Sequence, residues 1–236
     1  MKRILLFGAL ALSFLSYASA QQNGSRFEFS LQTAHPKAKA LMKDDFFWSP
    51  IDDAGPFGSD GGSDAAYGFH DWRPGHFSES PIIYLGNLIE RYQYPPIAWD
   101  ELDTNRLKEY MHIDYAPDEA GIDKMVQLLK NEQDENAKRS VSAKKLTDEQ
   151  LRQIVVKSGN NMGASYLTDL DESIIGTAFA QICMEGRLDV KLKYYVTKAL
   201  QREMLPLITR NYGNANQRQA YNDKMRKLLF VVNQMK

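Results

Sequence analysis

The residues best suited to chemistry gather in one short segment, which runs from Asp44 to Arg73. Its sequence, DDFFWSPIDDAGPFGSDGGSDAAYGFHDWR, mixes carboxylates with aromatic rings and glycines. Carboxylate oxygens, together with free carbonyls in a turn-rich loop, are the ligands that Ca²⁺ and Mg²⁺ prefer. The same carboxylates also attract a cationic ligand. The segment therefore predicts a recognition site for positive charge, either a metal ion or a cationic group.

A metal site in this segment would use four carboxylates, those of Asp52, Asp53, Asp60 and Asp64, around calcium or magnesium. The spacing is not that of an EF-hand, because no D-x-D-x-D-G run is followed by a bidentate Glu. On this hypothesis the protein is a metal-dependent, hydrolase-like enzyme in which His70 moves a proton. The competing hypothesis is architectural and requires no cofactor, since Asp and Ser residues also cap helices and form turns.

Aromatic side chains in the same segment favour a third interpretation, a surface that binds another protein. Trp48, Phe57 and Trp72 are the candidate anchors, and the neighbouring carboxylates would select the partner. Dense Phe and Trp residues also form ordinary core, so we expect most of the ring area to be buried. We predict a non-enzymatic binding or interaction protein. Its candidate ligand-binding residues are Trp48, Asp52, Asp53, Phe57, Asp60, Asp64, His70 and Trp72.

Other catalytic signatures are absent from the sequence. The four histidines show no H-x-x-x-H or H-E-x-x-H spacing, which leaves a zinc site unsupported. Neither G-x-S-x-G, a P-loop nor G-x-G-x-x-G occurs. The single cysteine, Cys183, falls on an apolar helical stripe and is expected to be a small buried hydrophobic residue. With one cysteine, no intrachain disulfide forms, and stability depends on packing.

Composition places the chain among ordinary globular proteins. It has 236 residues, of which 43% are hydrophobic and 25% charged, with a formal net charge of −1. Nucleic-acid binding requires a surplus of Lys and Arg on one face, so this balance gives no indication of a nucleic-acid partner.

The first twenty residues have the pattern of a secretory signal peptide. Lys2 and Arg3 precede an apolar run, and Ala18-Ser19-Ala20 matches a small-residue cleavage site. The apolar run is shorter than the ~20 residues that cross a bilayer, so no stable membrane insertion is expected after cleavage. Residues 1–20 are therefore predicted to be removed, which leaves an exported protein, periplasmic or extracellular, with a charge of 27 − 30 = −3.

Residues 21–236 are predicted to form a single, mainly α domain. Ser80-Pro81 starts one helix, and the Ile122-Met125-Val126-Leu129 spacing marks another. Thr147 and Gln150 fit a capping box, Gly186 ends a helix and Pro206 bends or ends the next.

The C-terminal half is expected to be a helical bundle, joined to a Gly/Asp-rich loop that feeds a short helix ending at Pro74-Gly75. Residues 131–145 carry many charges and are predicted to be an exposed loop. At most a short strand is expected, at residues 26–32 near the mature N-terminus.

Two runs carry a resemblance to a known family. Residues 44–48, DDFFW, and residues 56–65, PFGSDGGSDA, resemble an uncharacterised bacterial family with a D-D-F-[FY]-W and P-F-G-x-D-x-G-x-D-A signature. In the C-terminal half, residues 173–175, 179–181, 185–186 and 198–200 are also similar to that family, so the resemblance covers most of residues 31–205. It implies an α-rich fold and no established activity, with no catalytic residue to carry over. The export signal is a departure from the pattern of that family.

Overall fold

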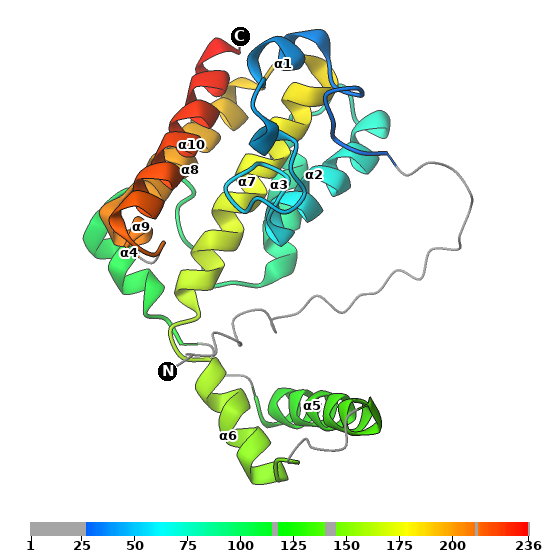
Figure 1. The fold of residues 1–236 in the computed structure, drawn as a ribbon, viewed down its shortest axis with the longest axis vertical. Helices are drawn as coiled ribbons and strands as arrows, with labels where there is room; N and C mark the ends of the chain where they lie inside the picture. The colour runs from blue at the N-terminus through cyan, green and yellow to red at the C-terminus, as the bar shows by residue number, and fades with distance from the viewer. Residues whose placement is uncertain (1–26, 115–117, 140–144, 211, 236) are drawn as a thin grey trace. The chain divides into compact units, whose positions relative to one another are not determined.

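The computed structural model in Figure 1 describes residues 27–114, 118–139, 145–210 and 212–235. Within these residues the secondary structure consists of ten α-helices and two short 3-10 helices, without a strand. The mainly α fold predicted from the sequence is confirmed. The described part of the expected N-terminal strand, residues 27–32, has turns and irregular backbone. The predicted signal peptide lies outside the described residues.

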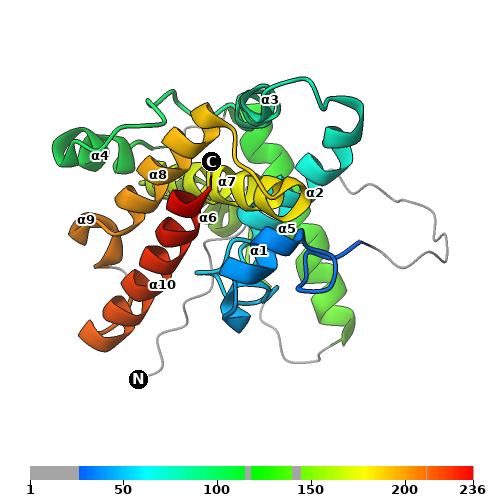
Figure 2. The ribbon, with the colours of Figure 1, turned by 90° about the horizontal axis from the view of Figure 1, so that it is seen from above.

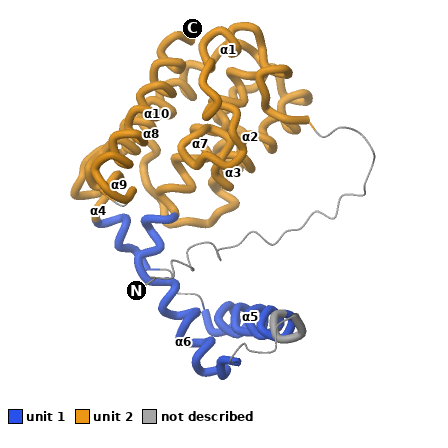
Figure 3. Tube along the Cα trace, viewed as in Figure 1, with its two compact units in different colours: residues 1–22, 109–165 blue, residues 23–108, 166–236 orange. Residues whose placement is uncertain are grey.

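The described residues divide into two compact units (Figure 3). One unit comprises residues 109–165, and the other comprises the described residues up to 108 together with residues 166–235. This differs from the single domain expected from the sequence. Apolar stripes on helices do not specify their partners, and here two neighbouring helices pack on each other to form a unit of their own.

The smaller unit is built around the pair α5 (Glu119–Arg139) and α6 (Asp148–Ser158), which pack on each other. Ile122 of α5 and the pair Leu151 and Val155 of α6 are buried, as their helical spacing predicts. Charged side chains join the two helices at the surface. Arg152 pairs with Glu119 and Asp123 of α5, and Lys130 pairs with Asp148 at 2.9 Å.

The predicted exposed loop at residues 131–145 is wrong for residues 131–139, which continue helix α5. The physical reason is that Glu, Gln, Lys, Arg and Ala are good helix formers even when few of them are buried. Tertiary contacts add to this preference. The side chain of Gln133 accepts a hydrogen bond from the backbone N–H of Leu146 at 2.7 Å, and Asp134 pairs with Lys145 at 2.5 Å.

The larger unit is organised around α7 (Gly163–Glu185), of which residues 166–185 belong to this unit. Seen from above in Figure 2, α7 lies between α8 (Val190–Glu203) with α10 (Ala215–Gln234) on one side and α2 (Asp60–Trp72) with α3 (Pro81–Tyr92) on the other. Residues 173–183 of α7 are all buried, so this helix has no solvent face along that stretch. The other elements of this unit are α1 (Pro36–Leu41), η1 (Asp45–Phe47), η2 (Arg73–Gly75), α9 (Pro206–Thr209) and most of α4 (Thr104–Met111).

Helix boundaries follow the local signals in the sequence. The Ser80 side chain caps α3, whose first residue is Pro81, and Thr147 and Gln150 form the predicted capping box of α6. Helix α7 ends at Gly186, where φ is +63° and glycine avoids the strain that a side chain would introduce. Pro206 begins α9 after α8 has ended. None of the helices described here combines the length and the apolar character required to cross a membrane.

Helices α2 and α7 approach each other at two glycines. A Cβ atom added to Gly176 of α7 would overlap the backbone of Gly62 in α2, and the two backbones are therefore in direct contact. Gly86, in the middle of α3, has no heavy atom within 4 Å of the position that a Cβ would occupy. The two helical glycines thus offer a matched pair, one in a tight crossing and one in open space.

We expect Gly176→Ala to lower the free energy of unfolding by ~1–3 kcal/mol, because the added methyl group forces α2 and α7 apart. Gly86→Ala should raise it by about 0.5–1 kcal/mol, since alanine favours the helix and meets no neighbour. Urea unfolding of residues 21–236 measures both changes. A Gly176→Ala protein as stable as Gly86→Ala would contradict the close crossing.

Candidate functional site

Two carboxylates of the 44–73 segment hold the loop onto α10. Lys227 lies 2.5 Å from Asp44, and Lys224 lies 2.6 Å from Asp52. Both lysine ammonium groups also lie within 6.0 Å of the ring centre of buried Phe46. The ammonium groups thus contact both the carboxylates and the ring face, which stabilises the docking of the loop.

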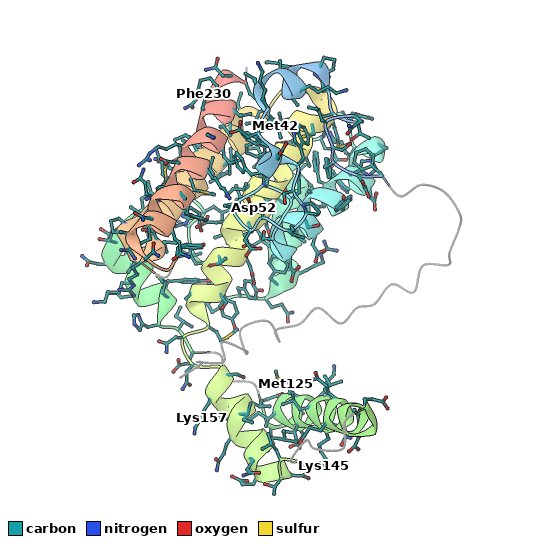
Figure 4. All side chains as sticks on the ribbon, in the orientation of Figure 1. Met42, Asp52, Met125, Lys145, Lys157 and Phe230 are labelled. Atoms are coloured by element: carbon teal, nitrogen blue, oxygen red, sulfur yellow. The ribbon has the colours of Figure 1, made fainter. Side chains whose placement is uncertain are left out.

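Asp52, labelled in Figure 4, also organises the turn that follows it. Its side chain accepts a hydrogen bond from Ala54 N–H at 3.2 Å, and its carbonyl accepts one from Gly55 N–H at 2.7 Å. A Cβ atom at Gly58 would overlap the Asp52 backbone, so this turn requires glycine there. The architectural interpretation therefore accounts for all the contacts of Asp52.

The aromatic candidates have different surroundings. Phe57 is buried and stacks on Phe29 with 4.6 Å between ring centres, so it belongs to the core. Trp48 is half-buried, and its indole N–H donates to the carbonyl of Met42 at 3.0 Å. Trp72, at the end of α2, is half-buried and lines a surface groove. Of the three predicted anchors, Trp72 has the surroundings of a binding residue.

Asp60 and Asp64 occupy one face of α2, a single turn apart, and both are exposed. Within the described part of the chain, neither has an ion-pair or hydrogen-bond partner for its carboxylate. Partial loss of hydration against the helix surface and the charge of Asp60 raise the pKa of Asp64 above its usual value. Like charges four residues apart destabilise a helix, although Asp60 gains from its place at the positive N-terminus. Helix stability alone therefore does not explain this pair.

Helix α7 contributes two more carboxylates to the same region. Glu172 lies against the first turn of α2, because a Cβ atom added at Gly61 would overlap its carboxylate. Burial raises its pKa to about 7. Asp169 accepts a hydrogen bond of 2.6 Å from the Tyr94 hydroxyl, and burial raises its pKa as well, with a further contribution from the charge of Asp60.

These two residues were missed in the sequence analysis. They lie about a hundred positions from the acidic segment, on a helix whose other residues are mostly apolar. Their residue type is the feature of the sequence that could have identified them. Ionisable residues on a mostly apolar helix require a partner inside the protein.

A groove between α2 and α3 is lined by Asp64, one of the two unpaired carboxylates of α2. It has a volume of about 720 Å³, with Trp72, Tyr84 and Leu88 as its apolar lining. Asp64, Glu90 and Arg91 supply charge at the same groove. Aromatic rings beside a surplus of carboxylates suit a ligand that has both an aliphatic or planar part and a positive charge.

The four proposed metal ligands do not converge. In the described residues no three His, Cys, Asp or Glu side chains are grouped as metal ligands. Asp52 is paired with Lys224, whereas Asp60 and Asp64 interact through space as two like charges. His70, the proposed proton carrier, stacks on Phe27 with 3.9 Å between ring centres, and its Nδ1 lies 2.9 Å from Asp71.

Comparisons with known proteins identify no relative. No protein-family model matches the chain, and neither the curated proteins nor the solved structures include a match. The family resemblance of residues 31–205 therefore stays a prediction.

We expect divalent cations to leave the thermal unfolding midpoint of residues 21–236 unchanged, because a ligand raises the midpoint only when it binds the folded state preferentially. The measurement compares EDTA with added calcium, magnesium, manganese or zinc. A concentration-dependent rise with one cation that disappears in Asp60→Asn and Asp64→Asn would contradict this expectation and favour the metal-site hypothesis.

Proposed function

We propose that this protein is a non-enzymatic binding protein, and that the α2–α3 groove with Asp60 and Asp64 receives a basic segment of another protein. The observation that carries the proposal is the contrast among acidic residues of one segment. Asp44, Asp52 and Asp71 each have a cationic or imidazole partner within the chain. Asp60 and Asp64 have none in the described residues, and Asp64 lines an open groove; Asp45 and Asp53 are unpaired there as well but do not line it.

The chemistry of the groove favours lysine or arginine side chains as ligands. Their aliphatic stems or planar heads would pack on Trp72 and Tyr84, and their charge would reach Asp64. Arg91 lines the same groove and would repel a positive charge placed next to it. A ligand would therefore need its positive charges spaced so that they reach Asp64 and avoid Arg91. Trp72 supplies the aromatic anchor that protein interfaces commonly use.

Export is part of the proposal. The signal-peptide pattern of residues 1–20 supports a location in the periplasm or outside the cell, where the partner would also have to be. The mature charge of −3, 27 basic against 30 acidic residues, supports a basic partner and no nucleic-acid partner.

The test uses fluorescein-labelled penta-arginine, with penta-glutamate as the peptide of opposite charge, and follows binding by fluorescence anisotropy. We expect penta-arginine to bind residues 21–236 and to bind more weakly as salt rises, because screening weakens exposed charge pairs. Asp60→Asn/Asp64→Asn should weaken the affinity about tenfold, which corresponds to about 1.4 kcal/mol. Penta-glutamate should not bind.

The matched control removes two exposed carboxylates from the smaller unit, in Asp123→Asn/Asp148→Asn. This variant has the same net charge as the site variant and keeps the groove intact. An equal loss of affinity in both double variants would attribute binding to overall charge and overturn the proposed site.

A further inference from the structure

The outer face of α8 combines apolar, aromatic and basic side chains. Val190, Tyr194 and Lys198 follow one another at intervals of four residues, so they share one face of the helix, and Lys191 borders it. Val190 is 82% exposed and Tyr194 is 48% exposed. The ammonium group of Lys198 lies 5.6 Å from the centre of the Tyr194 ring. These four residues form the α8 face.

The segment that precedes α4 places another aromatic residue beside the α8 face. The half-buried ring of Trp99 meets that of Tyr195 edge to face, with 5.2 Å between ring centres. The next residue, Asp100, accepts a hydrogen bond of 2.7 Å from the Tyr194 hydroxyl. The aromatic surface therefore extends from the helix onto this segment.

A buried guanidinium group fastens the same segment to α8. Arg202 and its partner Asp171 are both fully buried. The Arg202 side chain also donates to the carbonyls of Trp99 and Glu101, at 3.1 and 2.7 Å. The backbone that carries Trp99 is thus held in place before any partner arrives, which reduces the entropy that binding would cost.

Exposed apolar side chains continue at the start of α3. Ser80, the cap of α3, donates a hydrogen bond of 3.2 Å to Asp189, the cap of α8, so the first turns of the two helices are neighbours. Phe77, which precedes α3, is 61% exposed, and Ile83 in its first turn is 48% exposed. Exposed apolar surface is therefore concentrated where α3 and α8 begin.

The charge of the α8 face is positive. Within the described residues, neither Lys191 nor Lys198 has an ion-pair partner. Asp100 is the carboxylate beside them, bound to the Tyr194 hydroxyl, whereas Asp189 accepts from backbone N–H groups at the start of the helix. Two lysines against one carboxylate give a positive surface on a chain that is acidic as a whole, so this face attracts an anionic partner.

We propose that the α8 face docks on an anionic lipid surface, with Val190 and Tyr194 in the headgroup layer and Lys191 and Lys198 at the lipid phosphates. Tyrosine, tryptophan and lysine suit this layer because each has an apolar body and a polar tip. Lysine is depleted from protein interfaces, which favours lipid over an acidic protein as the partner. The α2–α3 groove uses other helices, so this inference does not rest on the proposed function.

A second copy of the chain is a poorer occupant of the α8 face. In a symmetric contact of two α8 helices centred on Tyr194, an antiparallel pair places Lys191 of each copy opposite Lys198 of the other. A parallel pair places each lysine opposite its own counterpart. Like charges would meet in both arrangements, which disfavours a dimer through this face.

The test is co-sedimentation of residues 21–236 with sucrose-loaded vesicles, made either of POPC or of POPC and POPG in equal parts. We expect binding to the POPG vesicles that weakens as salt rises, and no binding to POPC alone. Lys191→Gln/Lys198→Gln should lower the partition coefficient about tenfold. Val190→Trp should raise it several-fold, because tryptophan favours the headgroup layer and the position is exposed.

The matched control is Lys124→Gln/Lys157→Gln, which removes two exposed lysines from the smaller unit and has the same net charge. This variant should bind the POPG vesicles as the unmodified chain does. An unmodified chain that stays in the supernatant with POPG vesicles would overturn the proposal. An equal loss of binding in both double variants, or unchanged binding of Val190→Trp, would overturn it as well.

Discussion

The larger unit depends on one constraint, which is that α7 is almost wholly buried from residue 170 to residue 183 and still carries polar side chains there. A buried polar group without a partner costs free energy, and on α7 the Thr177 hydroxyl is one buried group that lacks a hydrogen bond. Other polar side chains of this helix have partners inside the protein. Asp171 pairs with Arg202 of α8, Ser173 shares a hydrogen bond with Tyr92, and Gln181 accepts from the backbone N–H of Asp189. These contacts point to different neighbours, so together they set how α3 and α8 are placed along α7.

The same constraint shapes the candidate site. Glu172 packs against the first turn of α2 at Gly61, whereas Asp60 and Asp64 of the same helix are exposed. The glycine contact between Gly62 and Gly176 brings the two backbones together and keeps that arrangement tight. The unpaired carboxylates are thus held on a rigid element, as a recognition site requires. Lys224 and Lys227, in contrast, pair with Asp52 and Asp44, the two carboxylates that hold the loop onto α10.

Much of the fold was predictable from the sequence, because helix ends and buried stripes are local features. The Thr147 capping box and the stop at Gly186 depend on a few neighbouring residues and were identified correctly. The partners of the acidic residues were not predictable in this way. Lys224 lies 172 positions from Asp52, so no local pattern separates this paired carboxylate from the unpaired one of Asp64. The helical end of α5 was missed because a charged sequence is compatible with both an exposed loop and an exposed helix.

The candidate site on α2 and the buried Glu203 of α8 are connected through a row of carboxyl groups. The charge of Asp60 raises the pKa of Asp169, the charge of Asp169 raises that of Glu172, and Glu172 does the same to Glu203. A cation bound at Asp60 would reduce the negative charge at the first member and favour ionisation of the second and third. Linkage is reciprocal, so ionisation of Glu172 would strengthen cation binding by the same factor. The binding surface on α2 and the carboxyl groups of Asp169 and Glu172 on α7 are therefore expected to respond to each other without any movement of the helices.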